Sequence, residues 1–371
     1  MTVSLLTPPT RDSGRRRRQL SRRGVLGAAG AVAMTPLLAA CRGGEADAAH
    51  GGDPDEVTYL TAFGESGRDA YARVAQRRGY FAEAGIEVTI EPGAAGDANH
   101  QALAGGAAQF AVVDAAGAFI RYANGVDDSF QIVAAIHQQP LIGLVAFADS
   151  GIRRPRDLSG RTVGLAAGSI AETLWPTYAE LAGLDPGEVE TVPTSPQTQV
   201  QELVAGQLDA IGLFVVGAPG IEAAGGGREV VSLPFSDYLA DLYGAVLVAQ
   251  RELITDQPDL VRRFTEALLR GLAEAVADPA SAGEILHAAQ PTQDPVVAAA
   301  ELSLMHSYVH TGLAPDEPVG FLDPTRVAGG MALLAGIGEI EGDFGAALGT
   351  PGRDRDGLVD YLVVPGPEVA E

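Results

Sequence analysis

The sequence predicts an α/β fold built as two similar lobes with a ligand cleft between them. From residue 57 onward, short apolar runs that suit buried strands alternate with longer runs of helical periodicity, which is typical of α/β folds with largely parallel sheets. A helix, a glycine and a strand also recur one hundred residues apart, at 103–114 and 203–214. With 371 residues, of which 46% are apolar, the chain is long enough for two packed lobes.

The expected elements follow these runs in chain order. Residues 57–63 suit a strand, a helix over 69–78 ends at Gly79, and residues 86–90 suit a second strand. Further strands are expected at 110–113, 132–136, 141–148, 162–165, 189–192, 210–215 and 245–249. Further helices are expected at 99–104, 172–181, 198–205, 258–277 and 296–309.

The repeated unit suggests how these elements divide between lobes. Residues 56–145 would open lobe 1, 146–235 would form lobe 2, 236–350 would return to lobe 1 with the C-terminal helices, and 351–371 would be a tail. The stretches 141–150 and 231–250 would then cross between the lobes. Such a molecule offers one natural ligand site, in the cleft bounded by strand carboxyl ends and helix N-termini. The recurrence of the pattern at 103–114 and 203–214 also has a simpler explanation, because any α/β protein repeats units of helix, glycine and strand.

The N-terminal residues are typical of an export signal. Seven arginines lie within residues 1–40, and residues 24–40 carry no charge. Residues 21–26, SRRGVL, resemble a twin-arginine motif, and residues 38–41, LAAC, resemble a lipobox whose cysteine becomes lipidated. We therefore expect a signal peptide over 1–40, a lipid anchor on Cys41, a flexible tether over 41–55, and a protein on the outer face of the bacterial cytoplasmic membrane. An uncleaved anchor is the alternative, although Pro36 and many small residues make a poor spanning helix.

Composition excludes several functions. The net charge of −23 argues against nucleic acid as a partner. Every basic residue is arginine, so neither a pyridoxal-phosphate Schiff base nor a phosphate-loop lysine can form. One cysteine excludes an internal disulfide, and the six histidines show no paired metal-ligand spacing. No nucleophile-elbow or zinc-protease motif occurs, so we expect a binding protein without cofactor or metal and not an enzyme.

Two phrases carry a family resemblance: residues 79–88, GYFAEAGIEV, and residues 155–164, PRDLSGRTVG. With 68–75, 102–106 and 203–210, they resemble the substrate-binding proteins of ABC importers, in the branch of nitrate, sulfonate and taurine receptors and proteins similar to thiamine-pyrimidine synthase. The resemblance implies the bilobed periplasmic-binding-protein clamshell, a small-molecule ligand and an importer permease as partner. The synthase pattern uses lysine-bound pyridoxal phosphate and a cysteine-rich iron motif, both of which this chain lacks. An exported enzyme on the same scaffold and a sensor lipoprotein remain alternatives.

Candidate ligand contacts cluster where strands end and helices begin. An acceptor such as Asp114 opposite an aromatic face such as Phe214 suits a flat, nitrogen-bearing ring. This favours a neutral or cationic heterocycle, such as a vitamin precursor, over a sulfonate or nitrate, and the ligand itself stays open. Each candidate also has a structural explanation, as a helix cap, a core residue or a solvated side chain. The candidates are Phe63, Glu65, Ser66, Arg68, Asp114, His137, Gln138, Ser169 and Phe214.

Overall fold

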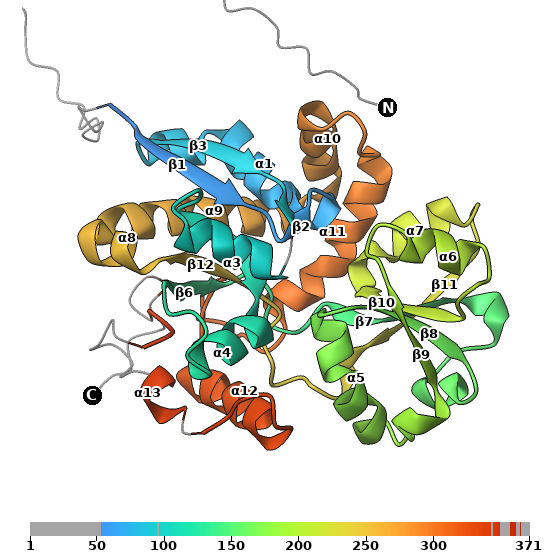
Figure 1. Ribbon diagram of the computed structural model, residues 1–371. Coiled ribbons are helices and arrows are strands. Elements are labelled where there is room, and N and C mark those ends of the chain that lie inside the picture. The colour runs from blue at the N-terminus through green and yellow to red at the C-terminus, as the bar shows by residue number, and fades with distance from the viewer. Residues whose placement is uncertain (1–52, 95, 343, 349–356, 361–363, 365–371) are drawn as a thin grey trace, which may run out of the picture. The chain divides into compact units, whose positions relative to one another are not determined.

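The computed structural model in Figure 1 describes residues 53–94, 96–342, 344–348, 357–360 and 364. The predicted signal peptide, Cys41 and most of the tether and tail lie outside these residues. The described residues form one compact unit. Within the described residues, no helix combines the length and the apolar character needed to cross a membrane.

Two five-stranded sheets form the framework. In spatial order, the first sheet consists of β3 (Ile86–Glu91), β1 (Asp55–Leu60), β5 (Phe110–Asp114), β12 (Ala245–Gln250) and β6 (Phe130–Ala135). The second consists of β9 (Glu190–Thr194), β8 (Thr162–Ala166), β10 (Ala210–Phe214), β7 (Ile142–Phe147) and β11 (Val230–Pro234). A short pair, β2 (Phe63–Gly64) and β4 (Gly93–Ala94), adjoins the loop after β1.

The two sheets follow one plan. In each, the third strand pairs in parallel with the second and antiparallel with the fourth. The fourth strand arrives from the other sheet, because the chain crosses between β6 and β7 and returns between β11 and β12. The echoed strands β5 and β10 occupy the same third position. The predicted α/β fold of two similar lobes is therefore confirmed, with one antiparallel strand in each otherwise parallel set.

Helices surround the first sheet. They are α1 (Ala70–Arg78), α2 (Tyr80–Glu83), α3 (Gly96–Ala104), α4 (Ala115–Ala123), α8 (Arg251–Asp256), α9 (Pro258–Ala277), α10 (Pro279–Ala289), α11 (Pro295–His310), α12 (Pro324–Gly336) and α13 (Gly345–Leu348). Helix α1 packs closely on α9, where a Cβ on Gly271 would lie 2.5 Å from the Tyr71 carbonyl oxygen. This approach brings the loop that precedes α1 against the sheet edge (Figure 1).

Three helices accompany the second sheet: α5 (Ile170–Leu181), α6 (Gln199–Val204) and α7 (Ala218–Ala224). Helix α11 contacts both α7 and the 3₁₀ turn Gly67–Asp69 that leads into α1. It therefore touches elements of both lobes. Strands β4 and β11 and helices α2, α7, α8, α10, α12 and α13 were not predicted, because short or alanine- and glycine-rich segments carry little apolar periodicity.

Stacked aromatic side chains fill the core. Phe264 of α9 stacks on Phe110 of β5, with ring centroids 3.9 Å apart. In the second lobe, Tyr178 of α5 stacks on Phe235 at 4.2 Å, and the neighbouring Trp175 is 4% exposed. Trp175 is thus a core residue of the second lobe. Such packing fixes the strands whose ends carry the candidate site.

Candidate functional site

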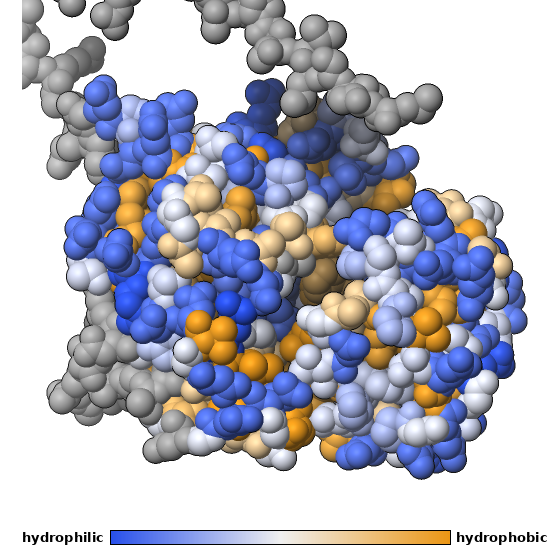
Figure 2. Space-filling view, in the orientation of Figure 1, coloured by the Kyte–Doolittle hydropathy of each residue, from blue (hydrophilic) through white to orange (hydrophobic). Residues whose placement is uncertain are grey.

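A pocket lies between the ends of the two central strands. Asp114 ends β5, Ala245 begins β12, and both line it beside Phe214, which ends β10 of the other sheet. Figure 2 shows the molecule hollowed between the elements of the two sheets, with mostly apolar residues visible in the hollow. The pocket contains about 30 Å³ of free space, which is enough for about two water molecules.

Four of the nine predicted contacts meet in this pocket: Arg68, Asp114, His137 and Phe214. They come from the loop before α1, the end of β5, the link after β6 and the end of β10. The pocket therefore receives polar groups from the first lobe and an aromatic ring from the second.

Asp114 combines a structural and a chemical role. One carboxylate oxygen, Oδ1, caps helix α4 by accepting hydrogen bonds from the backbone N–H groups of Ala116 at 2.9 Å and Gly117 at 3.4 Å. No hydrogen bond to the other oxygen is found among the described residues. Burial raises the pKa of Asp114 to about 6. The helix-cap reading is thus correct, and it leaves one oxygen able to accept a bond from a ligand.

His137 is the most unusual group in the pocket. Its side chain is buried, only 4% exposed, yet neither ring nitrogen has a hydrogen-bond partner. Burial, and then the positive charge of Arg68, lower the pKa of His137 to about 3, so the ring is neutral at physiological pH. A neutral imidazole offers one donor and one acceptor. Leaving both unpaired costs about 1–3 kcal/mol for each group, which argues against a purely structural role.

Gly244 helps to fix the position of His137. The backbone N–H of Gly244 donates to the His137 carbonyl oxygen at 3.1 Å. A Cβ on Gly244 would lie 2.4 Å from the Gln139 carbonyl oxygen and 2.9 Å from the His137 Cβ. Only glycine allows this approach, so the link before β12 holds the histidine against the pocket.

Phe214 and Arg68 meet across the pocket. The guanidinium carbon of Arg68 lies 4.6 Å from the centroid of the Phe214 ring, within the range of a cation–π contact. Arg68 also donates to the Phe63 carbonyl oxygen, and its Nε lies 3.5 Å from the Asp69 carboxylate without a hydrogen bond. The guanidinium therefore covers the aromatic face that β10 presents.

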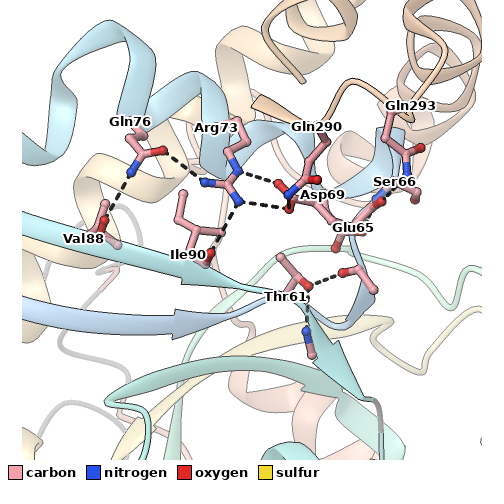
Figure 3. A network of polar contacts seen from close by, with 12 residues as sticks. Thr61, Glu65, Ser66, Asp69, Arg73, Gln76, Val88, Ile90, Gln290 and Gln293 are labelled. Atoms are coloured by element: carbon pink, nitrogen blue, oxygen red, sulfur yellow. Dashed lines mark hydrogen bonds and ion pairs between the residues drawn. The ribbon is translucent and has the colours of Figure 1, made fainter. Parts of the chain in front are cut away.

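Glu65 does not line the pocket. Its carboxylate accepts from Arg73 Nε at 2.5 Å and from Gln290 at 3.0 Å, as Figure 3 shows. Gln293 also donates to the Glu65 carbonyl oxygen at 2.8 Å. These contacts tie the loop before α1 to helices α1 and α10. The carboxylate is buried in an ion pair, so the expectation of a solvated side chain is wrong.

The remaining predicted contacts also lie outside the lining. Phe63 supplies its carbonyl oxygen to Arg68, and the buried Ser66 hydroxyl has no partner. Gln138 donates to the Phe321 carbonyl oxygen and accepts from Arg326, each at 3.0 Å. Ser169 caps α5 by accepting from the Glu172 N–H at 3.3 Å, while the Glu172 carboxylate accepts from the Gly168 N–H. Gln138 and Ser169 thus stabilise backbone turns.

Sequence reasoning missed six of the ten lining residues, and two of these six, Tyr71 and Asp69, carry polar side chains. Tyr71 lies on α1, where its hydroxyl is 3.0 Å from that of Tyr59, and apolar periodicity gives no sign of a pocket there. Asp69 opens the helix expected over 69–78 and was not a candidate contact, yet its buried side chain lines the pocket, and burial raises its pKa. Across the described part of the chain, no group of three His, Cys, Asp or Glu side chains could hold a metal ion.

Comparison with known protein families identifies the family to which the chain belongs. The model of the family described as "NMT1/THI5 like" matches residues 70–282, more than half of the sequence. The chain belongs to the NMT1/THI5-like family. This confirms the resemblance carried by residues 79–88 and 155–164.

Two curated proteins are similar to this family member. The riboflavin-binding protein RibY of Chloroflexus aurantiacus is 27% identical over 216 residues, which are 57% of this chain and 60% of RibY. The 4-amino-5-hydroxymethyl-2-methylpyrimidine phosphate synthase of Legionella pneumophila is 27% identical over 223 residues, which are 59% of this chain and 68% of the synthase. One relative is thus named for binding and the other for catalysis.

Solved structures show the fold. The alkanesulfonate-binding protein SsuA of Xanthomonas axonopodis, bound to MOPS, superimposes with a TM-score of 0.61 at 16% identity over 78% of this chain and 96% of SsuA. A Candida albicans protein described as having the generic periplasmic binding protein fold gives 0.54 at 13% identity, over 78% of this chain and 92% of its own. The predicted periplasmic-binding-protein architecture is therefore confirmed.

Proposed function

We propose that this protein is an extracytoplasmic receptor that closes its lobes on a flat heterocyclic solute and delivers it to an ABC importer. The pocket carries the proposal, because a buried histidine with two unpartnered nitrogens faces it together with Asp114 and Phe214. Contacts from both lobes to one ligand favour the closed conformation, which is how a receptor signals that it is loaded.

The chemistry of these groups suits a nitrogen-bearing ring. The Phe214 ring offers a stacking surface, Asp114 accepts from a ring N–H or an amine, and neutral His137 donates to one ligand atom and accepts from another. A ring that carries both donors and acceptors would satisfy all of these groups. The name of the relative RibY, a riboflavin-binding protein, is in line with this class.

The charges around the pocket argue against a small anion. Its ten lining residues include one cation, Arg68, and two acids, Asp69 and Asp114. The cation already lies close to the Asp69 carboxylate. A sulfonate or nitrate would therefore meet more negative than positive charge. The solved alkanesulfonate receptor has the same fold, so oxyanions are the main competing ligands to test.

The N-terminal motifs support the location of the receptor. We propose that the twin-arginine motif directs export of the folded chain and that Cys41 carries a lipid anchor. Metabolic labelling with palmitate should mark the full chain and fail on the Cys41→Ser variant. Labelling of both proteins would contradict the anchor.

Catalysis like that of the pyrimidine synthase is the other candidate, favoured by the Legionella relative. This chain has no lysine to hold pyridoxal phosphate, which the synthase pattern requires. The receptor therefore remains the function that the pocket supports best. Chemical conversion of a bound pyrimidine by the purified chain would reverse this choice.

Equilibrium binding tests the proposal. The purified full chain is titrated with riboflavin, 4-amino-5-hydroxymethyl-2-methylpyrimidine, hexanesulfonate and nitrate. We expect a heterocycle to bind and the Phe214→Leu variant to lose at least about tenfold in affinity, because stacking and a well-filled centre dominate such sites. Phe147→Leu is the matched control, since Phe147 also lies under an arginine, Arg228, at 3.7 Å, but outside the pocket. Binding of oxyanions alone, or equal losses in both variants, would contradict the proposal.

A further inference from the structure

The Arg68 side chain covers the face of Phe214 on which the proposed ligand ring would stack. Its guanidinium lies over the Phe214 face at 4.6 Å, and the pocket around it contains only about 30 Å³ of free space. Small-molecule sites usually offer about 300–1,000 Å³. A ring can therefore reach Phe214 only if Arg68 leaves it.

Unpaired oxygens mark where Arg68 can go. The Ser66 hydroxyl, the Glu301 Oε2 and the Arg68 Nε are all buried, and none of the three atoms makes a hydrogen bond of standard geometry, although Ser66 lies close enough to Glu301 to lower the pKa of its carboxyl. Glu301 reaches the loop from α11, and a Cβ on Gly67 would lie 2.7 Å from its Oε2. The carboxylate thus rests directly on the backbone beside Arg68. Burial raises the pKa of Glu301, and the Arg68 charge and the Ser66 hydroxyl oppose this shift, so both groups lie near the carboxylate.

Glu301 also lies where the two lobes meet. Helix α11 contacts the turn Gly67–Asp69 of the first lobe and helix α7 of the second. A Cβ on Gly220 of α7 would lie 3.6 Å from the Glu301 Oε1. A guanidinium that pairs with Glu301 would therefore act at the junction between the lobes.

Resting on the proposed function, we propose that Arg68 is a specificity-determining residue that competes with the ligand for Phe214. In the conformation seen here it covers the ring. When a ligand stacks on Phe214, the guanidinium turns to pair with Glu301 and Ser66. The site then accepts solutes that stack better than a guanidinium, which are aromatic rings, and rejects small solutes that cannot displace it.

Affinities of three variants test this competition, with riboflavin and 4-amino-5-hydroxymethyl-2-methylpyrimidine as probes. Arg68→Met should bind the ring about twofold to thirtyfold more tightly, the range that a cation–π contact spans. Glu301→Gln should bind it more weakly, because the displaced guanidinium loses its ion-pair partner. In the Arg68→Met background, Glu301→Gln should have no further effect. Arg228→Met, which removes the matched contact over Phe147, should leave affinity unchanged.

Two outcomes would overturn the inference while the receptor function stands. Weaker binding by Arg68→Met would mean that Arg68 holds the ligand directly. An equal effect of Glu301→Gln with and without Arg68 would mean that the two residues act independently.

A double-mutant cycle measured without any ligand tests the contact between Arg68 and Phe214. It remains informative even if neither probe binds and the proposed function fails. Phe214→Leu should lower the urea midpoint of unfolding less in the Arg68→Met background than in the wild type, because the contact is already lost there. Equal shifts in both backgrounds would show that Arg68 does not rest on Phe214, and would overturn the inference.

Discussion

His137 should make the folded protein lose stability as the pH falls from 8 to 5. Burial, together with the Arg68 charge, lowers its pKa from 6.5 to about 3 in the folded chain. Below pH 6.5 the His137 side chain therefore binds a proton in the unfolded chain but not in the folded chain. The free energy of unfolding consequently decreases as the pH decreases. At pH 8 neither state is protonated at this site, so its contribution to the pH dependence is absent there.

The size of the loss follows from the two pKa values. Between pH 8 and pH 5, the missing proton lowers the free energy of unfolding by about 2 kcal/mol. The side chain is only 4% exposed, so solvent screening reduces this value little. Asp114 titrates with the opposite sign over part of the range, so the comparison is made between variants that all keep it.

Urea unfolding at pH 8 and pH 5 measures the effect in the wild type and in His137→Gln, which keeps a polar side chain that cannot titrate. The variant should lose about 2 kcal/mol less than the wild type over this interval. Tyr71→Phe is the control from the same pocket, because burial raises the pKa of Tyr71 and keeps it uncharged at both pH values. Equal losses in the wild type and His137→Gln would show that the histidine is not held neutral.

Three further predictions concern stability. Glu65→Gln leaves the partly buried Arg73 without its charged partner and should lower the free energy of unfolding by about 2–4 kcal/mol in urea titrations. A change within about 0.5 kcal/mol would refute the structural role. Gly67→Ala should lower the melting temperature, because the new Cβ would lie 2.6 Å from a backbone oxygen of α11. Gly117→Ala should not lower it, because no atom lies within 4 Å of the Cβ at that position. Equal effects of the two substitutions would contradict this packing. Asp114→Asn removes a carboxyl whose folded pKa is about 6, above 3.8. As the pH rises from 4 to 6, the wild type should therefore lose about 2 kcal/mol relative to the variant, and parallel stability curves would contradict the buried acid.

Local pattern was enough to predict the fold and four of the ten residues that line the pocket. The echo of 103–114 in 203–214 placed Asp114 and Phe214 at equivalent strand ends, and both line the pocket. This worked because strand ends are set by short-range hydrophobic runs and glycine stops, which a sequence displays directly.

Whether the remaining candidate residues are free to bind a ligand depends on partners that are distant in the chain. Gln138 was predicted as a contact, but Arg326, 188 residues later, takes its side-chain oxygen. Glu65 is bound by Arg73 and by Gln290 of the C-terminal region. Glu301 stood in a helical pattern with nothing to connect it to Arg68. A sequence shows which residues can bind a ligand, whereas only packing shows which of them are already engaged.

The most direct test of the account is a crystal structure of the chain with riboflavin or 4-amino-5-hydroxymethyl-2-methylpyrimidine bound. We expect the ring to lie against Phe214 with a hydrogen bond to Asp114 or His137, and the Arg68 guanidinium to be turned toward Glu301. A ligand bound outside this pocket, or one bound while Arg68 still covers Phe214, would contradict the account.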